Sequence, residues 1–168
     1  KLGSFGDIGS FSFYPSKNLG AFGEAGCIVT DNIDYYKKIR LLRNYGSEQR
    51  YVWQIKGVNE RMDTIQAAVL NVKLNHLDEW NQNRNIIASY YHKNLEGFNN
   101  IKSLGLVANN YSCYHLYVIK VHESDRDQLI EFLKKSNIGA GIHYPWPFYK
   151  SDAYKKMNHL KFPVTENN

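Results

Sequence analysis

The chain has 168 residues, of which 43% are hydrophobic and 14% aromatic, so it can fill the core of one ordinary domain or of parts of two and is not a disordered tail. Lys and Arg outnumber Asp and Glu by 21 to 16. Because the basic residues are scattered through helical segments and no nucleic-acid-binding module accompanies them, the charge predicts a solvated surface with some attraction for an anionic ligand.

Other function classes are excluded by what the sequence lacks. No apolar stretch approaches the roughly 18 residues of a membrane span, and no signal peptide is visible. Cys27 and Cys113 do not make a disulfide framework, so we expect a cytoplasmic location. The histidines are dispersed without ligand spacing, and no metal site is expected. The chain has no initiator Met and starts close to a strand-like segment, which indicates a fragment of a longer protein.

The N-terminal elements are two short strands, a loop and a helix. Residues 8–13 and 27–30 are strand-like and flank the loop 15–26, which is rich in glycine. Asp31 and Asn32 can cap a helix in which apolar residues recur at helical spacing. This helix is expected to end shortly before Gly46.

The middle of the chain predicts an irregular segment and then a long helix. Residues 47–59 are polar and aromatic without a clear period, whereas residues 62–81 are apolar over an arc wide enough to pack on two sides. The N-terminal half of this helix is therefore expected to lie against another body. Helix and strand patterns then alternate, as in a small α+β unit, at residues 83–96, 114–121, 125–136 and 140–144.

Lys17 is the residue most suited to chemistry. It follows the first strand and lies between Pro15, which stiffens the approach, and a glycine-rich turn, which lets a ligand come close to the backbone. A reactive amine must be held in place and partly desolvated, so that its neutral, nucleophilic form is available. Without further evidence, a lysine between a proline and a glycine-rich turn is more often an ordinary surface residue.

The residues around Lys17 closely resemble the lysine motif of the DegT/StrS-type sugar aminotransferases, which are fold type I enzymes dependent on pyridoxal phosphate (PLP). In that motif Ser-Phe, three further residues and Lys-Asn are followed by a glycine-rich turn. The resemblance implies that Lys17 attaches covalently to PLP. It also implies that Ser12 binds the PLP phosphate through its hydroxyl.

A second match runs from Gly57 to Ala68 and resembles the family signature Gly-x-Asn-x-Arg-Met-Asp-x-x-Gln-Ala-Ala. From its residues alone it is a loop before a helix start, with Asp63 in the first turn. In the family, the Asn that matches Asn59 reaches across a dimer interface to the phosphate of the partner's PLP. The resemblance therefore implies a homodimer with shared active sites, and we assign Arg61 to substrate binding.

Two further stretches bear on the substrate. Residues 43–47 resemble the Arg-Asn-Tyr-Gly-Ser stretch of the branch that aminates C3 of thymidine-diphosphate-linked (dTDP-linked) 3-keto-6-deoxyhexoses, where other members often carry His in place of Asn44. Residues 142–145 fall where the family has a substrate-side His-Tyr-Pro loop, which implies sugar or phosphate contacts for His143 and Tyr144. A lone histidine such as His143 equally fits a structural hydrogen-bonding role.

The resemblance covers essentially the whole chain from Gly6 onward and implies an α/β fold of the aspartate aminotransferase type. Residues 1–81 would be the end of the large PLP-binding domain with a long interdomain helix, and residues 82–168 an incomplete small α+β domain. In the family, the acidic partner of the pyridinium nitrogen and the aromatic ring stacked on the cofactor precede the lysine motif. Because this chain lacks both, we expect it to be inactive alone.

The implied activity is transfer of an amino group from L-glutamate to a nucleotide-linked keto-6-deoxyhexose, giving an amino sugar for cell-surface polysaccharide, such as lipopolysaccharide O-antigen, or another glycan. Three alternatives stay open. A PLP-dependent sugar dehydratase would be expected to carry His in place of Lys17. A catalytically inactive homologue would act only in dimerisation or regulation, and a nucleic-acid-binding module would bind DNA with a strong dependence on salt.

Overall fold

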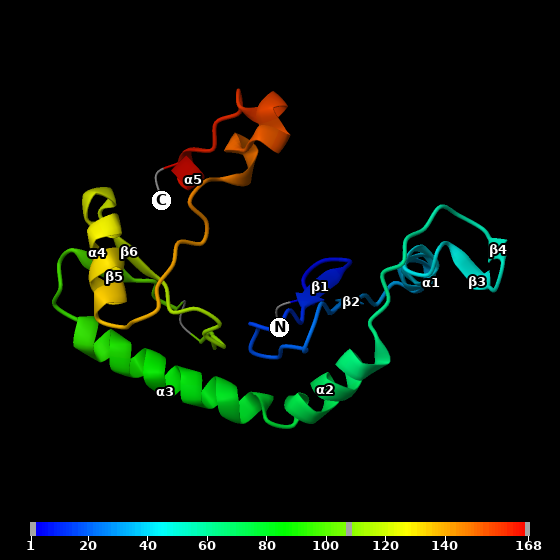
Figure 1. Ribbon diagram of the computed structural model, residues 1–168, viewed down its shortest axis with the longest axis horizontal. Helices are drawn as coiled ribbons and strands as arrows, with labels where there is room; N and C mark the ends of the chain where they lie inside the picture. Colours follow the sequence, from blue (N-terminus) through cyan, green and yellow to red (C-terminus); the bar gives the residue numbers. More distant parts are fainter. Residues whose placement is uncertain (1–2, 107–108, 167–168) are drawn as a thin grey trace. The chain divides into compact units, whose positions relative to one another are not determined.

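The computed structural model describes residues 3–106 and 109–166 (Figure 1). The chain divides into two compact units. One comprises residues 1–98 and 103–119, and the other comprises residues 99–102 and 120–168. The predicted domain boundary between residues 81 and 82 stays a prediction.

The first unit begins with the predicted pair of strands. Strands β1 (Gly9–Ser12) and β2 (Gly26–Val29) are antiparallel, with Gly9 opposite Val29 and Ser12 opposite Gly26. Backbone hydrogen bonds of Phe13 with Ala21 and Ala25, both 2.8 Å, continue the pairing beyond β1 and close the base of the loop that carries Lys17.

Helix α1 (Ile33–Leu42) begins where the sequence predicts it. The Asn32 side chain caps its first turn by accepting hydrogen bonds from the backbone N–H groups of Asp34 and Tyr35. The segment after α1 was predicted to be irregular, but it contains a short antiparallel hairpin, β3 (Ser47–Gln49) with β4 (Val52–Trp53). Its strands are too short for a two-residue period to be visible in the sequence.

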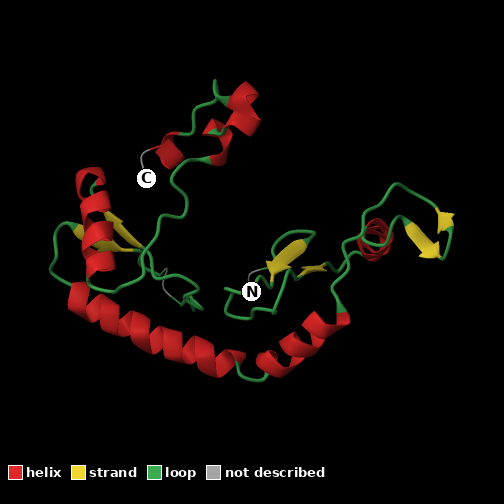
Figure 2. Cartoon of the chain, viewed as in Figure 1, coloured by secondary structure: helices red, strands yellow, loops and turns green. Residues whose placement is uncertain are grey.

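The prediction of a single long helix over residues 62–81 is wrong. Helix α2 (Thr64–Leu74) ends at Asn75, and a separate helix, α3 (Leu77–Leu95), follows (Figure 2). The apolar pattern runs on through the break, but Lys73 in the last turn of α2 and two acidic residues in the first turn of α3 favour one helix end and one helix start.

The remaining elements are short apart from one helix. Strands β5 (Ile101–Ser103) and β6 (Ile119–Val121) form a two-stranded sheet, so the predicted strand at 114–121 is confirmed only at its end. The second unit contains α4 (Glu123–Lys135), the 3-10 helices η1 (Phe148–Lys150) and η2 (Asp152–Met157), and α5 (Pro163–Glu166). The predicted piece at 140–144 has no regular structure.

Little of the described chain is buried. The buried apolar residues are Ala21, Leu70, Ala88 and Tyr149. Large apolar side chains on α2 stay open to solvent, among them Ile65 at 69% and Val72 at 65% exposure. The described helices include none long and apolar enough to cross a membrane.

Candidate functional site

Lys17 lies in a tight turn within the loop that joins β1 to β2. Its backbone N–H donates to the carbonyl of Tyr14 at 2.8 Å, and the side chain is half-buried. Among residues 3–106 and 109–166, the amine of Lys17 has neither an ion pair nor a hydrogen bond. A lysine on a fixed turn whose amine is not tied to a carboxylate is available to react with an aldehyde.

Helix α2 holds the glycine-rich half of the same loop. The Gln66 side-chain oxygen accepts a hydrogen bond from the backbone N–H of Phe22 at 2.8 Å, and the Lys73 amine donates to the carbonyl of Gly20 at 2.7 Å. The Lys73 amine also lies 4.7 Å from the centre of the Phe22 ring. These contacts join the loop to a rigid helix, so the turn at Lys17 is supported from its C-terminal side.

Asn18 supports the turn through a different contact. Its amide nitrogen donates to the Asn81 side-chain oxygen at 2.8 Å and to the carbonyl of Cys113 at 2.7 Å. Asn81 belongs to α3, and Asn85 of the same helix donates to the carbonyl of Ser112 at 2.8 Å. The residue next to Lys17 is therefore anchored to two segments that are distant in sequence.

Ser12 is the last residue of β1 and lies on the same hairpin as Lys17. Its exposed hydroxyl oxygen accepts from the backbone N–H of Tyr14 at 3.3 Å. The hydroxyl proton remains available to an acceptor such as a phosphate oxygen. The structure thus keeps an amine and a hydroxyl donor on one short hairpin, which fits an aldehyde that also carries a phosphate.

Asn59 and Arg61 come together with the stretch 43–47. The guanidinium of Arg61 donates to the side-chain oxygens of Asn59 at 3.0 Å and Asn44 at 3.2 Å, and it lies 5.4 Å from the centre of the Tyr45 ring. Asn44 and Asn59 also form an antiparallel backbone bridge. The two stretches that carried the family resemblance on sequence alone are thus physically joined.

Two glycines allow this close approach. Gly46 has φ +73°, a conformation that residues with a side chain rarely adopt, and a β-carbon there would overlap the carbonyl oxygen of Ile55. A β-carbon on Gly57 would overlap the backbone nitrogen of Gly46. The chain crosses itself at this point because both positions lack a side chain.

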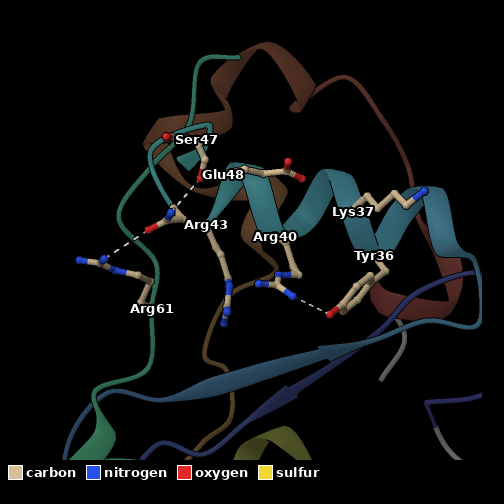
Figure 3. A pocket seen from close by; sticks show the side chains of 8 residues that line it. Tyr36, Lys37, Arg40, Arg43, Ser47, Glu48 and Arg61 are labelled. Atoms are coloured by element: carbon tan, nitrogen blue, oxygen red, sulfur yellow. Dashed lines mark hydrogen bonds between the residues drawn. The ribbon is translucent and has the colours of Figure 1, made fainter. Parts of the chain in front are cut away.

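A cavity of about 470 Å³ lies between α1 and this crossing (Figure 3). Four cationic side chains and one carboxylate line it, together with Tyr36, Asn44 and Ser47; the charged residues are Lys37, Arg40, Arg43, Arg61 and Glu48. The Arg40 side chain donates to the Tyr36 hydroxyl at 2.9 Å, and this hydrogen bond raises the pKa of Arg40. The excess of positive charge favours an anionic ligand on this face.

His143 and Tyr144 belong to the second unit, where both side chains are exposed and their rings lie 5.5 Å apart. Their predicted substrate contacts stay a prediction. Among the described residues, no cluster of His, Cys, Asp or Glu could hold a metal ion.

Sequence reasoning missed the residues that hold the lysine loop. Gln66 entered the sequence analysis only as part of the family signature, and Lys73 and Asn81 entered it only as members of the predicted helix at residues 62–81. A signal did exist for Gln66, because a polar residue on the apolar face of α2 must have a partner. For Asn81 there was none, since its partner lies 63 residues away in the chain.

Comparisons with known proteins identify relatives that match nearly the whole chain. The chain is 41% identical over 99% of its length to a dTDP-3-amino-3,6-dideoxy-alpha-D-galactopyranose transaminase from Aneurinibacillus thermoaerophilus, covering 45% of that protein. It is likewise 41% identical to the erythromycin biosynthesis sensory transduction protein EryC1 from Saccharopolyspora erythraea, covering 99% of this chain and 46% of that protein. The chain thus spans somewhat less than half the length of these relatives.

Solved structures resemble the fold closely. DesV from S. venezuelae, solved in complex with a ketimine intermediate, matches with a TM-score of 0.84 and 39% identity over 90% of this chain and 40% of DesV. NtdA from Bacillus subtilis, solved with bound cofactor PMP, matches with a TM-score of 0.87 and 29% identity over 98% of this chain and 40% of NtdA.

A lysine on a supported hairpin, in a fold shared with these structures, defines part of a fold type I PLP-dependent transferase. The chain belongs to the DegT/DnrJ/EryC1/StrS aminotransferase family, whose model matches residues 1–168. The expected family and fold are therefore confirmed.

Proposed function

We propose that this chain is part of a PLP-dependent aminotransferase that converts a nucleotide-linked keto sugar into an amino sugar, with Lys17 as the catalytic residue. The observation that carries the proposal is the amine of Lys17, which has no partner among the described residues and lies on a turn that α2 and α3 support. Membership of an aminotransferase family supports the same reaction class.

The residues of this chain fit the cofactor at its aldehyde and phosphate ends. PLP, when bound, supplies an aldehyde carbon that takes up an amine and a ring that accepts electrons from the adjacent bond. In this proposal the amine of Lys17 would hold the cofactor at that carbon, and the free amine would carry a proton between the substrate carbon and the aldehyde-derived carbon. The Ser12 hydroxyl donates to the phosphate.

Asn59 completes the phosphate site from the partner subunit, so the proposed enzyme is a homodimer. Apolar side chains exposed on α2, such as Ile65 and Val72, support association because an uncovered apolar face is stabilised by burial against another surface. In this arrangement each active site requires two chains.

The substrate is proposed to be an anionic nucleotide sugar. The cationic lining of the cavity beside α1 attracts its phosphates. A role of His143 and Tyr144 in contacts with the sugar or phosphate belongs to the same proposal and rests on the family resemblance. A dTDP-linked 3-keto-6-deoxyhexose is favoured by the stretch 43–47 and by the name of the Aneurinibacillus transaminase. Another relative, 36% identical, is named for a UDP-linked sugar, so the nucleotide is the first specificity to measure.

The donor in this proposal is L-glutamate, and the product enters a cell-surface polysaccharide or another glycan. A cytoplasmic location belongs to the same proposal and agrees with two free cysteines.

Borohydride reduction of the intact gene product, followed by peptide mass analysis, tests the attachment. We expect the cofactor mass on the peptide that contains Lys17 and its loss in Lys17→Arg, which keeps the charge but cannot form the bond. Lys134→Arg, on the surface of α4, is the matched control. Attachment at another lysine, or none, would overturn the proposal.

The activity is tested by incubating the same protein with glutamate and candidate dTDP- and UDP-linked keto sugars, with detection of the product by mass. For at least one of these sugars we expect an increase in mass that corresponds to replacement of the keto oxygen by an amino group. A protein that carries the cofactor on Lys17 but aminates no nucleotide sugar would contradict the substrate class and leave the attachment standing.

A further inference from the structure

Arg61 occupies an unusual position for a residue expected to bind substrate. Its Nε donates to the Oδ1 atom of Asn59 at 3.0 Å, and its Nη1 donates to the Oδ1 atom of Asn44 at 3.2 Å. One planar guanidinium thus binds two amide oxygens from two segments. The Tyr45 ring 5.4 Å away further restricts its movement.

These bonds fix which end of each amide faces outward. An asparagine amide has an oxygen that only accepts and a nitrogen that only donates. Asn44 uses its nitrogen to donate to the carbonyl of Ser47 at 2.8 Å. The amide nitrogen of Asn59 has no hydrogen-bond partner within the part of the chain that the structure describes, so it is the donor this network leaves unused.

We propose that Arg61 is a positioning residue that holds the Asn59 amide with its nitrogen directed at the phosphate of the partner subunit's cofactor. The inference rests on the proposed function, in which Asn59 reaches that phosphate. A phosphate dianion offers acceptors alone, so an amide turned the other way would bring two acceptors together. The bond from Arg61 excludes that orientation before the cofactor binds.

This assignment replaces the expected role of Arg61 in direct substrate binding. Two of its five donors are already used within the chain, and the backbone bridge between Asn44 and Asn59 keeps both acceptors in place. Asn44 acquires a role as well, because its oxygen is the second point that holds the guanidinium.

A double-mutant cycle in the intact gene product separates the two roles. The measured quantities are the dissociation constants of PLP and of pyridoxal, which lacks the phosphate, from the cofactor-free protein. The variants are Arg61→Met, Asn59→Ala and both together, with Arg126→Met on α4 as a control for loss of one positive charge. Arg61→Lys, which keeps the charge, and Asn44→Ala, which removes the second acceptor, are measured alongside. The melting temperature of every variant is measured as well.

We expect Arg61→Met to weaken PLP about three- to tenfold, the effect of losing one oriented hydrogen bond, and to leave pyridoxal unchanged. Arg61→Lys should resemble it, since an ammonium lacks the planar fork, and Asn44→Ala should weaken PLP less. In the Asn59→Ala background, Arg61→Met should have no further effect on PLP.

Three results would overturn the inference. The first is an unchanged affinity for PLP in Arg61→Met together with a raised KM for the sugar, which would indicate that Arg61 binds the substrate directly. The second is that Arg61→Met weakens PLP binding as much in the Asn59→Ala background as in the wild type, which would indicate that Arg61 binds the phosphate directly. The third is that Arg61→Met weakens the binding of PLP and of pyridoxal equally, which would indicate a structural defect. If Asn59→Ala itself binds PLP normally, the proposed role of Asn59 fails instead, while attachment at Lys17 is judged by its own experiment.

Discussion

Asn18, the residue after the proposed catalytic lysine, donates a hydrogen bond of 2.8 Å to the side chain of Asn81 in α3. The same amide nitrogen reaches the carbonyl of Cys113, so both of its protons have acceptors. The turn that carries Lys17 is thereby fastened to the helix that follows the break at Asn75.

Asn18→Asp changes the size of the side chain very little, but it should clearly destabilise the protein. A carboxylate cannot donate, so two acceptors would lose their partner and face a negative charge. The loss at the part-buried oxygen of Asn81 costs about 1–3 kcal/mol. We expect a lower melting temperature and a lower kcat. Asn94→Asp is the matched control, because the side chain of Asn94 makes a single, exposed hydrogen bond within the described residues, to Tyr90 of the same helix. Equal effects of the two substitutions would show that the contact with Asn81 is unimportant.

Gln66 offers a cleaner test of how the lysine loop is supported. Gln66→Glu keeps an oxygen that can accept from the backbone N–H of Phe22, whereas Gln66→Leu does not. We expect the leucine variant to lose about 1 kcal/mol of loop stability, with faster proteolysis near Phe22 and reduced kcat, and the glutamate variant to stay close to the wild type. Comparable rates of cleavage and turnover in both variants would contradict this role.

The sequence predicts those parts of the site that depend on contacts between residues close together in the chain. The cap of α1 and the loop that carries Lys17 depend on neighbours in the chain, and the sequence predicted both, with Asp31 and Asn32 as the two candidates for the cap. The helix break near Asn75 was missed because apolar residues continue on both sides of it, and only the charges mark the ends.

The pairing of the stretches 43–47 and 57–61 could not be predicted from either one. It depends on hydrogen bonds between residues 17 positions apart, from Arg61 to Asn44, and on two glycines that approach each other. The resemblance to a family gave Asn59 and Arg61 as important residues, but only the geometry distinguishes a residue that contacts a ligand from one that orients its neighbour.

Gly46→Ala tests the crossing of these two stretches. The β-carbon would overlap the carbonyl oxygen of Ile55 while the backbone keeps φ +73°, and the left-handed conformation alone costs roughly 1–2 kcal/mol for a residue with a side chain. We expect a clearly lower melting temperature together with weaker PLP binding, since Asn59 lies at the same crossing. Gly139→Ala is the control, because a β-carbon there meets nothing within 4 Å. Unchanged melting of Gly46→Ala would show that the crossing can rearrange.

We expect the stability of the second unit to depend on pH through the hydrogen bond between Tyr149 and Glu166. The hydroxyl of Tyr149, which is buried, donates to the Glu166 carboxylate at 2.9 Å. This bond lowers the pKa of Glu166, while burial first and the bond second raise the pKa of Tyr149. The carboxylate is thus bound in its charged form and the phenol in its neutral form.

The sign of the effect follows from proton binding. Folded Glu166 holds its proton more weakly than the unfolded chain does, so the stabilisation is present above the ordinary glutamate pKa of about 4.3 and is lost as pH falls through the lowered value. Folded Tyr149 holds its proton more tightly, so its contribution is present below about pH 10 and is lost as pH rises through the raised value.

Tyr149→Phe should therefore lower the melting temperature at pH 7. At pH 3 and below, the difference in melting temperature between this variant and the wild type should be smaller. Tyr154→Phe, an exposed residue of the same unit, should change neither. A deficit in Tyr149→Phe that is the same at pH 7 and pH 3 would mean that packing of the ring, and not the bond to Glu166, stabilises this end of the chain.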